Sequence, residues 1–284
     1  MVGRPNVGKS SLINALVGTK VGIVSDRPQT TRFLVRGILN EPSLQLVFTD
    51  TPGLHKPRNV LGQRLNQRVD EAVAGVDVLV LVVDGAAGVG RGDAFVAERE
   101  VEPFAGPRIV AVNKVDRLRG RAVVPQLAAA ADLAPFDHVL PVSARTGAGV
   151  PELSAVLRTL APEGPPLFPA DRASDQSLEQ LVADVVREKA LALTREEVPH
   201  AIAVVVEEVD RSGPVVRIDC RVFVERESQK GILIGRGGAT LREVGSRARP
   251  EVERLVGAHV YLDLRVSVLP RWQRDPAVWD RLGL

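Results

Sequence analysis

The stretch GRPNVGKS, Gly3 to Ser10, decides the fold of the first part of this 284-residue chain. It matches G-x-x-x-x-G-K-[ST], a glycine-rich loop that cradles nucleotide phosphates between a strand and a helix. The helix is predicted directly after the loop, because Leu12, Ile13 and Leu16 recur on one helical face. The pattern therefore predicts a phosphate-binding site close to the beginning of the sequence.

The strand that should precede this loop is short, since only Met1 and Val2 stand before Gly3. In phosphate-loop folds this strand lies within the parallel sheet and has about five or six residues. Each buried backbone group that loses its partner costs roughly 1–3 kcal/mol. We therefore expect the native protein to carry several further apolar, β-prone residues before Val2.

The composition indicates a globular protein with ample core material, because 45% of the residues are apolar and 25% are charged. The length suits about two domains of ~150 residues. The net charge of +2 does not indicate a nucleic-acid-binding protein by itself, so any basic surface must be local. No apolar run reaches the roughly 18 residues of a membrane span, and no signal peptide is seen. We expect a cytoplasmic protein without a transmembrane segment.

Apolar runs alternate with helical stretches over residues 1–160, which predicts an α/β domain. Four runs predict strands, and the last three of them along the chain are almost continuously apolar. We therefore expect those three to be buried on both faces of a mostly parallel sheet. The runs that predict strands are Leu44–Asp50, Val76–Asp84, Arg108–Lys114 and His138–Ala144. The segment 161–175 holds four prolines, which predicts a linker between domains.

The rest of the chain predicts an α+β domain over residues 176–270 and a tail over residues 271–284. Its elements follow the order helix, strand, strand, helix, helix, strand, with the glycine loop GRGG between the last two helices. The single cysteine, Cys220, excludes a disulfide framework within the chain, and its alternating apolar neighbours predict a buried strand position. Trp272 and Trp279 of the tail either pack on this domain or extend a nucleic-acid surface.

Features of a nucleotide site accompany the glycine-rich loop. Lys9 would reach the β- and γ-phosphates, and the Ser10 hydroxyl would bind Mg²⁺. DTPG follows a predicted strand, so Asp50 can hold the Mg²⁺ shell and the Gly53 N–H group can contact the γ-phosphate. Thr31, in the loop RPQTTR (27–32), can offer an oxygen to Mg²⁺ and the γ-phosphate.

NKVD and the later pair SA indicate which base is bound. The Asp116 carboxylate can accept two parallel hydrogen bonds from guanine, whereas adenine lacks that pair of donors. Asn113 and Lys114 would support the loop and the base, and SA suits a backbone contact to guanine. Together the motifs predict a guanine-nucleotide switch domain with GTP or GDP and Mg²⁺ as ligands. The residues predicted to bind them are Gly3, Asn6, Val7, Gly8, Lys9, Ser10, Ser11, Asp50, Gly53, Asn113, Lys114, Asp116, Ser143 and Ala144, with Ser10, Thr31 and Asp50 at the metal.

These motifs resemble those of the translation-factor-like GTPases, and within them the Era family. GRPNVGKSSLINAL, PQTTR, DTPGLHKP, NKVD and VSA are similar to its G domain, and FVERESQKGILIGRGGATL is similar to its KH domain. The resemblance covers essentially the whole chain. It implies a P-loop NTPase G domain with a mostly parallel sheet, followed by an α+β type II KH domain.

The same resemblance implies a function. It implies a ribosome-assembly GTPase that binds 16S ribosomal RNA near its 3′ end and has the 30S subunit as its partner. A weak peripheral contact with the inner membrane is a further expectation.

The loop GRGG, Gly235 to Gly238, can clamp a single RNA strand of about four nucleotides, because glycines let two backbones approach closely. The alternative is a tight helix–helix turn with a solvated basic face. Ile232 to Ile234 before the loop and Leu241 after it are expected to form an apolar floor for bases. The residues predicted to bind RNA are Lys230, Gly235, Arg236, Gly237, Gly238 and Arg242.

Hydrolysis is expected to be slow, because Leu54 follows DTPG where many GTPases place a glutamine that orients water. The neighbouring His55 is expected to be solvated rather than catalytic. Similar GTPases with an asparagine at the position of Asn6 complete their site with potassium, which makes K⁺ a candidate third ligand. The residues expected to carry catalysis are Lys9, Asn6, Thr31 and Gly53.

Three other functions compete with this interpretation. A tRNA-modification GTPase would carry a C-terminal cysteine, whereas Cys220 lies in a predicted strand. A GTPase with two G domains would show two phosphate loops, and this sequence has one. An RNA chaperone with a non-catalytic nucleotide pocket is disfavoured by intact Lys9, Ser10, Asp50 and Asp116.

Overall fold

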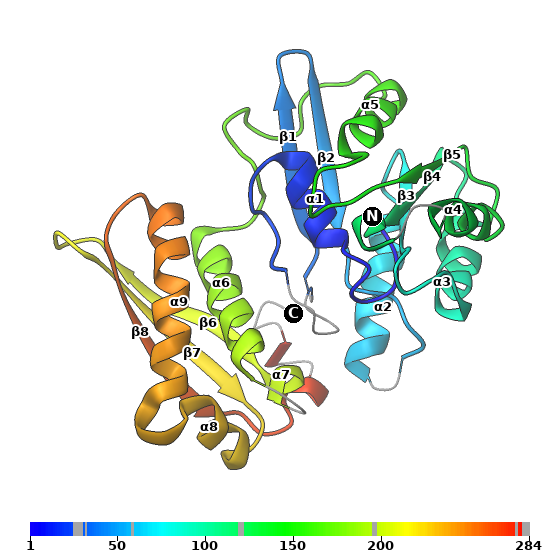
Figure 1. The fold of residues 1–284 in the computed structure, drawn as a ribbon. Coiled ribbons are helices and arrows are strands. Elements are labelled where there is room, and N and C mark those ends of the chain that lie inside the picture. Colours follow the sequence, from blue (N-terminus) through cyan, green and yellow to red (C-terminus); the bar gives the residue numbers. More distant parts are fainter. Residues whose placement is uncertain are drawn as a thin grey trace. The chain divides into compact units, whose positions relative to one another are not determined.

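Figure 1 shows the computed structural model of the chain, which describes residues 1–24, 31, 33–57, 60–118, 122–194, 198–275 and 278–279. The chain divides into two compact units, Met1–Asp175 and Gln176–Leu284. The predicted loop 27–32 lies outside the described residues except for Thr31.

The first unit contains a parallel three-stranded sheet in the order β3-β4-β5 and an antiparallel hairpin of β1 and β2. Its strands are β1 (Val35–Glu41), β2 (Leu44–Asp50), β3 (Leu79–Asp84), β4 (Arg108–Asn113) and β5 (His138–Pro141). Its helices are α1 (Lys9–Val17), α2 (Val60–Val73), α3 (Arg91–Val96), which continues as a π-helix over Ala97–Val101, α4 (Val123–Ala131) and α5 (Val150–Leu160). The predicted α/β class with a mostly parallel sheet is confirmed.

Helices cover both faces of the parallel sheet. Successive residues of β3 and β4 point to opposite sides, so each strand contributes to two separate apolar clusters. Val80 and Val82 pack in the same apolar cluster as residues of α1 and α5. Leu79, Leu81 and Val83 pack in a second cluster with residues of α2, α3 and α4. The helix predicted after the glycine-rich loop therefore buries Leu12, Ile13 and Leu16 as expected.

Residues 1–3 occupy the position of the strand before the glycine-rich loop. Val2 forms an isolated parallel bridge with Leu81, donating to the Val80 carbonyl and accepting from the Val82 amide, both at 2.9 Å. On its other side, the buried Met1 amino group donates to the carbonyl of Thr49 in β2 at 2.8 Å. These bonds join the hairpin to β3 and fix the start of the loop.

The structure corrects one sequence prediction, adds a strand, and gives the predicted linker a contact. Strand β1 is absent from the predicted strands; it pairs along its full length with β2. Strand β5 is only half-buried, not buried on both faces, because it ends the β3-β4-β5 order and pairs only with β4 among the described strands. The end of the predicted linker is bonded to β1, since the Ala173 carbonyl accepts from Ile38 at 2.9 Å and Ser174 bridges Gly37.

The second unit has the predicted order of helices and strands, with one additional short helix. Strand β7 lies in the middle of its sheet, antiparallel to β6 and parallel to β8. The elements are α6 (Leu178–Leu193), α7 (Val198–Ala201), β6 (Ala203–Asp210), β7 (Val216–Val224), α8 (Glu227–Ile234), α9 (Ala239–Val256) and β8 (Val260–Val268). The core lies between the sheet and helices α6, α8 and α9, where Val182, Ile218 and Val244 are fully buried.

The tail packs on this unit, which decides between the two alternatives for its tryptophans. Trp272 and Trp279 are 0% and 1% exposed. The Trp272 indole donates to the Ala201 carbonyl at 3.0 Å, and the Trp279 indole donates to the Trp272 carbonyl at 2.8 Å. Cys220 is buried in β7 as predicted, and burial raises the pKa of its thiol to about 12.

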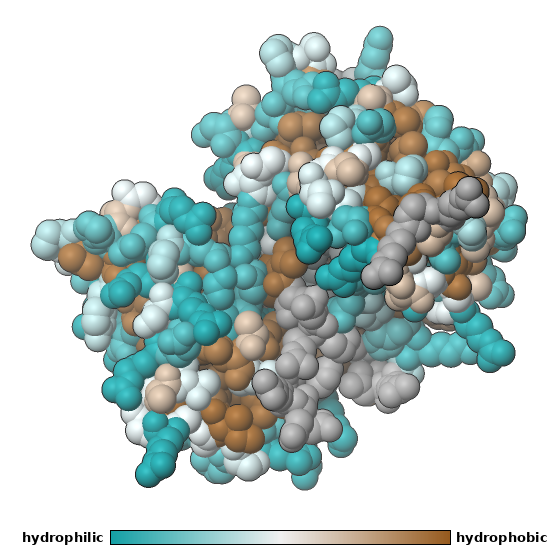
Figure 2. All heavy atoms as spheres, in the orientation of Figure 1, coloured by the Kyte–Doolittle hydropathy of each residue, from teal (hydrophilic) through white to brown (hydrophobic). Residues whose placement is uncertain are grey.

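The face of the molecule in Figure 2 is mostly hydrophilic, and apolar residues reach it in scattered patches. Among the helices of the described ranges, none is long and apolar enough to cross a membrane.

Candidate functional site

Two positions of the glycine-rich loop, Gly3 and Gly8, have no room for a side chain. Gly3 has a φ of 151°, and a Cβ there would lie 2.4 Å from the Val82 carbonyl oxygen. Gly8 has a φ of 97°, and a Cβ there would lie 2.4 Å from the Asn113 side-chain nitrogen. Asn6 also takes a positive φ, of 64°, which asparagine tolerates better than most residues. The loop thus folds tightly onto the ends of β3 and β4 before α1 begins at Lys9.

Lys9 is held inside this loop by the backbone. Its ammonium group donates to the carbonyls of Gly3 and Arg4, each at 3.1 Å, and the residue is 6% exposed. Burial lowers its pKa to about 8, against a smaller opposing effect from Asp50. Val7 is buried and Ser11 is half-buried in the first turn of α1.

The three residues predicted to hold a metal ion converge. The Ser10 hydroxyl donates to Asp50 Oδ2 at 2.6 Å, and the Thr31 hydroxyl donates to the same oxygen at 3.1 Å. The second carboxylate oxygen of Asp50 is buried and has no hydrogen-bond partner among the described residues. Burial raises the pKa of Asp50, although Lys9 and the Ser10 hydroxyl oppose that effect. Oxygen ligands with an unsatisfied carboxylate are what Mg²⁺ requires, so these residues fit that ion.

Gly53 lies against the glycine-rich loop. A Cβ at this position would stand 2.6 Å from both the nitrogen and Cα of Pro5. The next amide, that of Leu54, donates to the Gly3 carbonyl at 3.1 Å. The Leu54 side chain is fully buried in the apolar cluster beneath α2, so it does not face a site for water.

Asn113, at the end of β4, joins three loops of the site. Its side-chain nitrogen donates to the Val7 carbonyl at 2.9 Å. Its side-chain oxygen accepts from the amides of Lys114 and Ala144, at 2.8 and 3.1 Å. Asn113 is 1% exposed, so no solvent competes for these bonds. A single amide therefore ties the phosphate loop to both loops predicted to contact the base.

Asp116 is oriented by its neighbours. The buried Ser143 hydroxyl donates to Asp116 Oδ1 at 2.7 Å, and Arg145 lies 3.0 Å from Oδ2. The hydrogen bond from Ser143 lowers the pKa of Asp116, and Arg145 adds to this effect. The carboxylate is therefore ionised at neutral pH. The group next to its Oδ2 atom is the guanidinium of Arg145, whose side chain is exposed.

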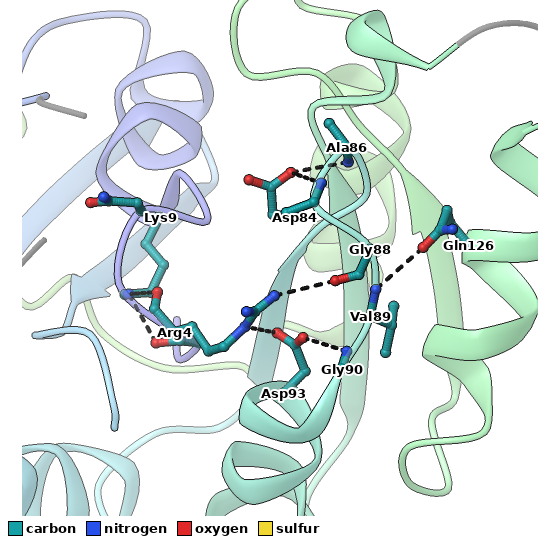
Figure 3. Close-up of polar contacts among 12 residues, drawn as sticks. Arg4, Lys9, Asp84, Ala86, Gly88, Val89, Gly90, Asp93 and Gln126 are labelled. Atoms are coloured by element: carbon teal, nitrogen blue, oxygen red, sulfur yellow. Dashed lines mark hydrogen bonds and ion pairs between the residues drawn. The ribbon is translucent and has the colours of Figure 1, made fainter. Parts of the chain in front are cut away.

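Lys114 takes a left-handed backbone conformation, with a φ of 63°. Its ammonium group donates to the Asn6 carbonyl and to Asp84 Oδ2, both at 2.6 Å. Asp84 Oδ1 accepts from the amides of Ala86 and Ala87, each at 3.0 Å (Figure 3). Lys114 thus connects the base loop, the phosphate loop and the end of β3.

The glycine loop of the second unit lies between α8 and α9. Gly235, Gly237 and Gly238 have φ angles of 73°, 59° and 78°, a run of conformations that L side chains rarely adopt. A Cβ on Gly235 would lie 2.2 Å from the Thr240 hydroxyl, whereas Gly237 and Gly238 face open space. The loop therefore leaves backbone accessible at Gly237 and Gly238.

Basic side chains surround this loop as predicted, with one correction to the apolar floor. Arg236 and Arg242 are both exposed, and Arg242 donates to the Gly237 carbonyl at 2.7 Å. Lys230 is half-buried on α8. Ile232 is 54% exposed beside the loop, but Leu233 is fully buried in the core and is not part of a floor, because consecutive helical residues point in different directions.

Comparison with known proteins identifies both units. Residues 1–114 match the family model described as 50S ribosome-binding GTPase, and residues 197–273 match the KH domain model. The chain is 47% identical to GTPase Era of Mycobacterium tuberculosis over 289 aligned residues, covering 100% of this chain and 96% of the relative. GTPase Era of Mycobacterium sp. strain KMS is equally similar, at 47% identity over 99% of this chain and 96% of the relative.

The chain belongs to the Era family of GTPases. Solved structures of Era agree with this assignment. A crystal structure of Era in complex with MgGDPNP and nucleotides 1506–1542 of 16S ribosomal RNA matches with a TM-score of 0.95 and 39% identity, over 99% of this chain and 96% of that chain. A variant of Aquifex aeolicus Era bound to GDP and AlF4⁻ matches with the same TM-score, identity and coverage.

Two groups of this Era-family site are missing from the residues predicted by sequence. Asp84, the partner of Lys114, ends a buried strand as Asn113 does, so the same signal could have found it. Asn14 of α1 accepts from the amides of Val21 and Gly22, both at 2.9 Å, and so fixes the chain that leaves α1. Nothing in its polar, helix-internal position indicates that role.

Proposed function

We propose that this Era-family protein hydrolyses GTP to GDP and phosphate, binds 16S ribosomal RNA near its 3′ end, and assists assembly of the 30S ribosomal subunit. The observation that carries the nucleotide part is the convergence of four separate loops on one site, with Asn113 bonded to three of them. In this proposal residues 1–160 form the nucleotide-binding domain and residues 176–270 form the RNA-binding domain. Residues 161–175 are the linker between them, and residues 271–284 are the tail.

The nucleotide is held at two places. The amides of the loop Gly3–Ser10 and the Lys9 ammonium take the phosphates, because the loop precedes a helix N-terminus where anions are stabilised. Asp116 takes the guanine edge, supported by Ser143. The remaining residues of the predicted set line the same loops: Asn6, Val7, Gly8, Ser11, Lys114 and Ala144.

Mg²⁺ is the ion that Ser10, Thr31 and Asp50 hold. In this proposal the ion takes up the buried Asp50 oxygen that otherwise lacks a partner among the described residues. When bound, Mg²⁺ neutralises charge that builds up on the phosphates. Lys9, Asn6, Thr31 and Gly53 then act at the γ-phosphate, and Gly53 does so from its contact with Pro5.

K⁺ is proposed as a further ligand of the site. Leu54 is buried and cannot orient water, so the site needs another source of positive charge or order. Asn6 is exposed at the edge of the phosphate loop, and its carbonyl is already bonded to Lys114. We assign its side chain to the potassium ion, because similar GTPases with an asparagine at this position complete their site with potassium.

RNA is proposed to pass over Gly235–Gly238, where backbone is accessible and Arg236 and Arg242 supply positive charge. Phosphates of a single strand can approach the N–H groups of Gly237 and Gly238 without meeting a side chain. Lys230 of α8 and the exposed Ile232 border the same loop. The partner chemistry is thus a short single-stranded segment rather than a duplex.

The proposed location is the cytoplasm, with a peripheral fraction at the inner membrane. Separation of host-cell membranes from cytosol, followed by immunodetection, tests this location, and a high-salt wash should release the membrane fraction. Retention after that wash would contradict a peripheral contact.

Two measurements on the full chain test the function. GTP hydrolysis is measured with and without a 16S rRNA fragment that contains the 3′ end, and crosslinking followed by sequencing identifies RNA bound in cells. The proposal expects slow hydrolysis and crosslinks near the 3′ end of 16S rRNA. A protein that binds GTP without hydrolysing it in either condition contradicts the enzymatic part, and crosslinks elsewhere contradict the RNA part.

A further inference from the structure

The side chain of Arg4, the second residue of the glycine-rich loop, points toward Asp93 of α3 (Figure 3). Its Nε atom donates to Asp93 Oδ1 at 2.7 Å, and its Nη2 atom donates to the Gly88 carbonyl at 3.3 Å. The Asp93 side chain is completely buried, whereas that of Arg4 is 30% exposed. Because Asp93 is buried, loss of Arg4 would leave its carboxylate without a compensating charge, which costs more than the loss of an exposed ion pair.

The segment that binds the Arg4 side chain, Gly88 to Asp93, is held in place by further hydrogen bonds. Asp93 Oδ2 accepts from the Gly90 amide at 3.0 Å, so both carboxylate oxygens are engaged. The Val89 amide donates to the side chain of Gln126 in α4 at 3.3 Å (Figure 3). Gly92 leaves the space that Arg4 fills, because a Cβ there would lie 2.5 Å from Arg4 Cδ.

The backbone of Arg4 takes part in holding Lys9. The Arg4 carbonyl and the Gly3 carbonyl are the two acceptors of the Lys9 ammonium group. Any rotation of the Arg4 backbone therefore moves one of these acceptors. The side chain of Arg4 prevents that rotation, since it is anchored at two points on the segment between β3 and the end of α3.

We propose that Asp93 is a positioning residue for nucleotide binding, which acts through Arg4 to hold the phosphate loop in its binding conformation. This inference rests on the proposed function of the same site. A loop that is already ordered loses less conformational freedom when the phosphates bind. The Arg4–Asp93 pair supplies that order from outside the nucleotide site, without contact to the ligand.

Substitutions at the two positions should weaken binding to the same extent. In Asp93→Asn the amide oxygen still accepts from Gly90, but the amide nitrogen faces Arg4 and the ion pair is lost. Arg4→Met removes the guanidinium and keeps most of the length of the side chain. We expect Kd for GDP and for GTP to rise about tenfold in either variant, a change of about 1.4 kcal/mol. We expect kcat at saturating GTP to change less than Kd does, because bound nucleotide itself restores the order of the loop.

The pair is tested by a double-mutant cycle on the full chain, with fluorescent GDP and GTP analogues as probes. Arg4→Met/Asp93→Asn should bind as weakly as either single variant, since both remove one interaction. Arg4→Lys should recover part of the affinity when Asp93 is present and none in the Asp93→Asn background. The matched control is Arg158→Met with Glu41→Gln, an ion pair of 2.6 Å in the same unit that does not touch the phosphate loop.

The outcomes separate this inference from the proposed function. Wild-type protein that does not bind guanine nucleotides overturns both. Normal wild-type binding with unchanged Kd values in the Arg4 and Asp93 variants overturns the inference alone, even if their melting temperatures fall. Losses that add in the double variant also overturn it. If Asp93→Asn does not fold, Arg4→Met and Arg4→Lys still decide the question, because the Arg4 side chain is partly exposed.

Discussion

Replacement of Asn113 by alanine should separate the loops of the nucleotide site while leaving the fold intact. The side chain makes three hydrogen bonds to backbone groups, those of Val7, Lys114 and Ala144. Asn113→Ala removes all three without adding volume to the core. The change therefore tests whether one buried amide organises the phosphate loop and the base loops together.

The magnitude follows from the number of bonds and their burial. A buried backbone group that loses its partner contributes a loss of about 1 kcal/mol, so three groups together cost about 3 kcal/mol of unfolding free energy. This is less than the total stability of about 5–15 kcal/mol of a typical domain, so the variant should fold. Because the three loops are then no longer tied, we expect Kd for GDP to rise at least about tenfold, or about 1.4 kcal/mol.

Hydrogen–deuterium exchange on the full chain measures both effects. Without nucleotide, peptides from β4 and α1 should exchange faster in Asn113→Ala, by an amount that corresponds to the lost free energy. GDP at a hundred times the wild-type Kd stabilises the wild type by about 2.7 kcal/mol, but a tenfold weaker variant by only about 1.4 kcal/mol. Asn40→Ala is the control, because Asn40 bonds to Arg172 and Gln45 away from the site. An Asn113→Ala protein with wild-type protection and wild-type GDP affinity would refute this reasoning.

Three further predictions follow from other residues. Arg236→Asp with Gly237→Asp places two carboxylates where RNA phosphates are proposed to pass, so affinity for a 16S rRNA 3′ fragment, measured by filter binding, should collapse while GTP binding persists; retained RNA binding would mean that this loop is not the clamp. Burial raises the pKa of Glu100 to about 7, so the folded protein keeps a proton that the unfolded chain loses near pH 4.5, and stability falls as pH rises from about 4.5 to about 7. Glu100→Gln should abolish that fall in urea titrations; an unchanged pH profile would argue against the assignment. The GTPase rate should rise when K⁺ replaces Na⁺ at fixed ionic strength, and Asn6→Ala should remove the difference; equal rates in both salts would exclude a potassium site.

The residues that can be predicted from sequence are those that end apolar strand runs. Asn113 ends β4 of the parallel sheet, and Asp50 ends β2 of the antiparallel hairpin. The spacing of the motifs is therefore sufficient to place these side chains near the phosphate loop. The glycine loop at Gly235 is predictable for a similar local reason, because glycine adopts the positive φ angles of Gly235, Gly237 and Gly238 without strain.

The contacts that support these residues cannot be predicted in the same way. Arg4 and Asp93 are 89 residues apart, and no periodicity relates a loop arginine to the third residue of a short helix. The motif NKVD assigns Lys114 to the base loop, but its ion pair with Asp84 depends on how the ends of β3 and β4 align. Such partners depend on the tertiary arrangement of the strands and not on local sequence.

The incorrect predictions have a common cause. The apolar run at His138–Ala144 indicates a strand buried on both faces, but β5 ends the sheet order and stays half-buried. Leu233 and Ile232 are both apolar and both precede the glycine loop, which suggests a shared role. Leu233 points into the core and Ile232 is exposed, because both lie in α8, which continues to Ile234. Hydrophobicity alone does not tell which side of an element is covered.

The measurement that tests the central claim most directly is the nucleotide preference of Asp116→Asn. The amide oxygen can still accept from Ser143, while the amide nitrogen replaces the carboxylate oxygen that is proposed to accept from guanine. One charge-assisted hydrogen bond to guanine is lost and the other loses its charge, so GTP affinity should fall at least about a hundredfold, or about 2.7 kcal/mol. Xanthosine triphosphate, whose 2-oxo group accepts where guanine donates, should bind this variant better than GTP does. Wild-type GTP affinity in Asp116→Asn, with no gain for xanthosine triphosphate, would contradict the assignment of this site to guanine nucleotides.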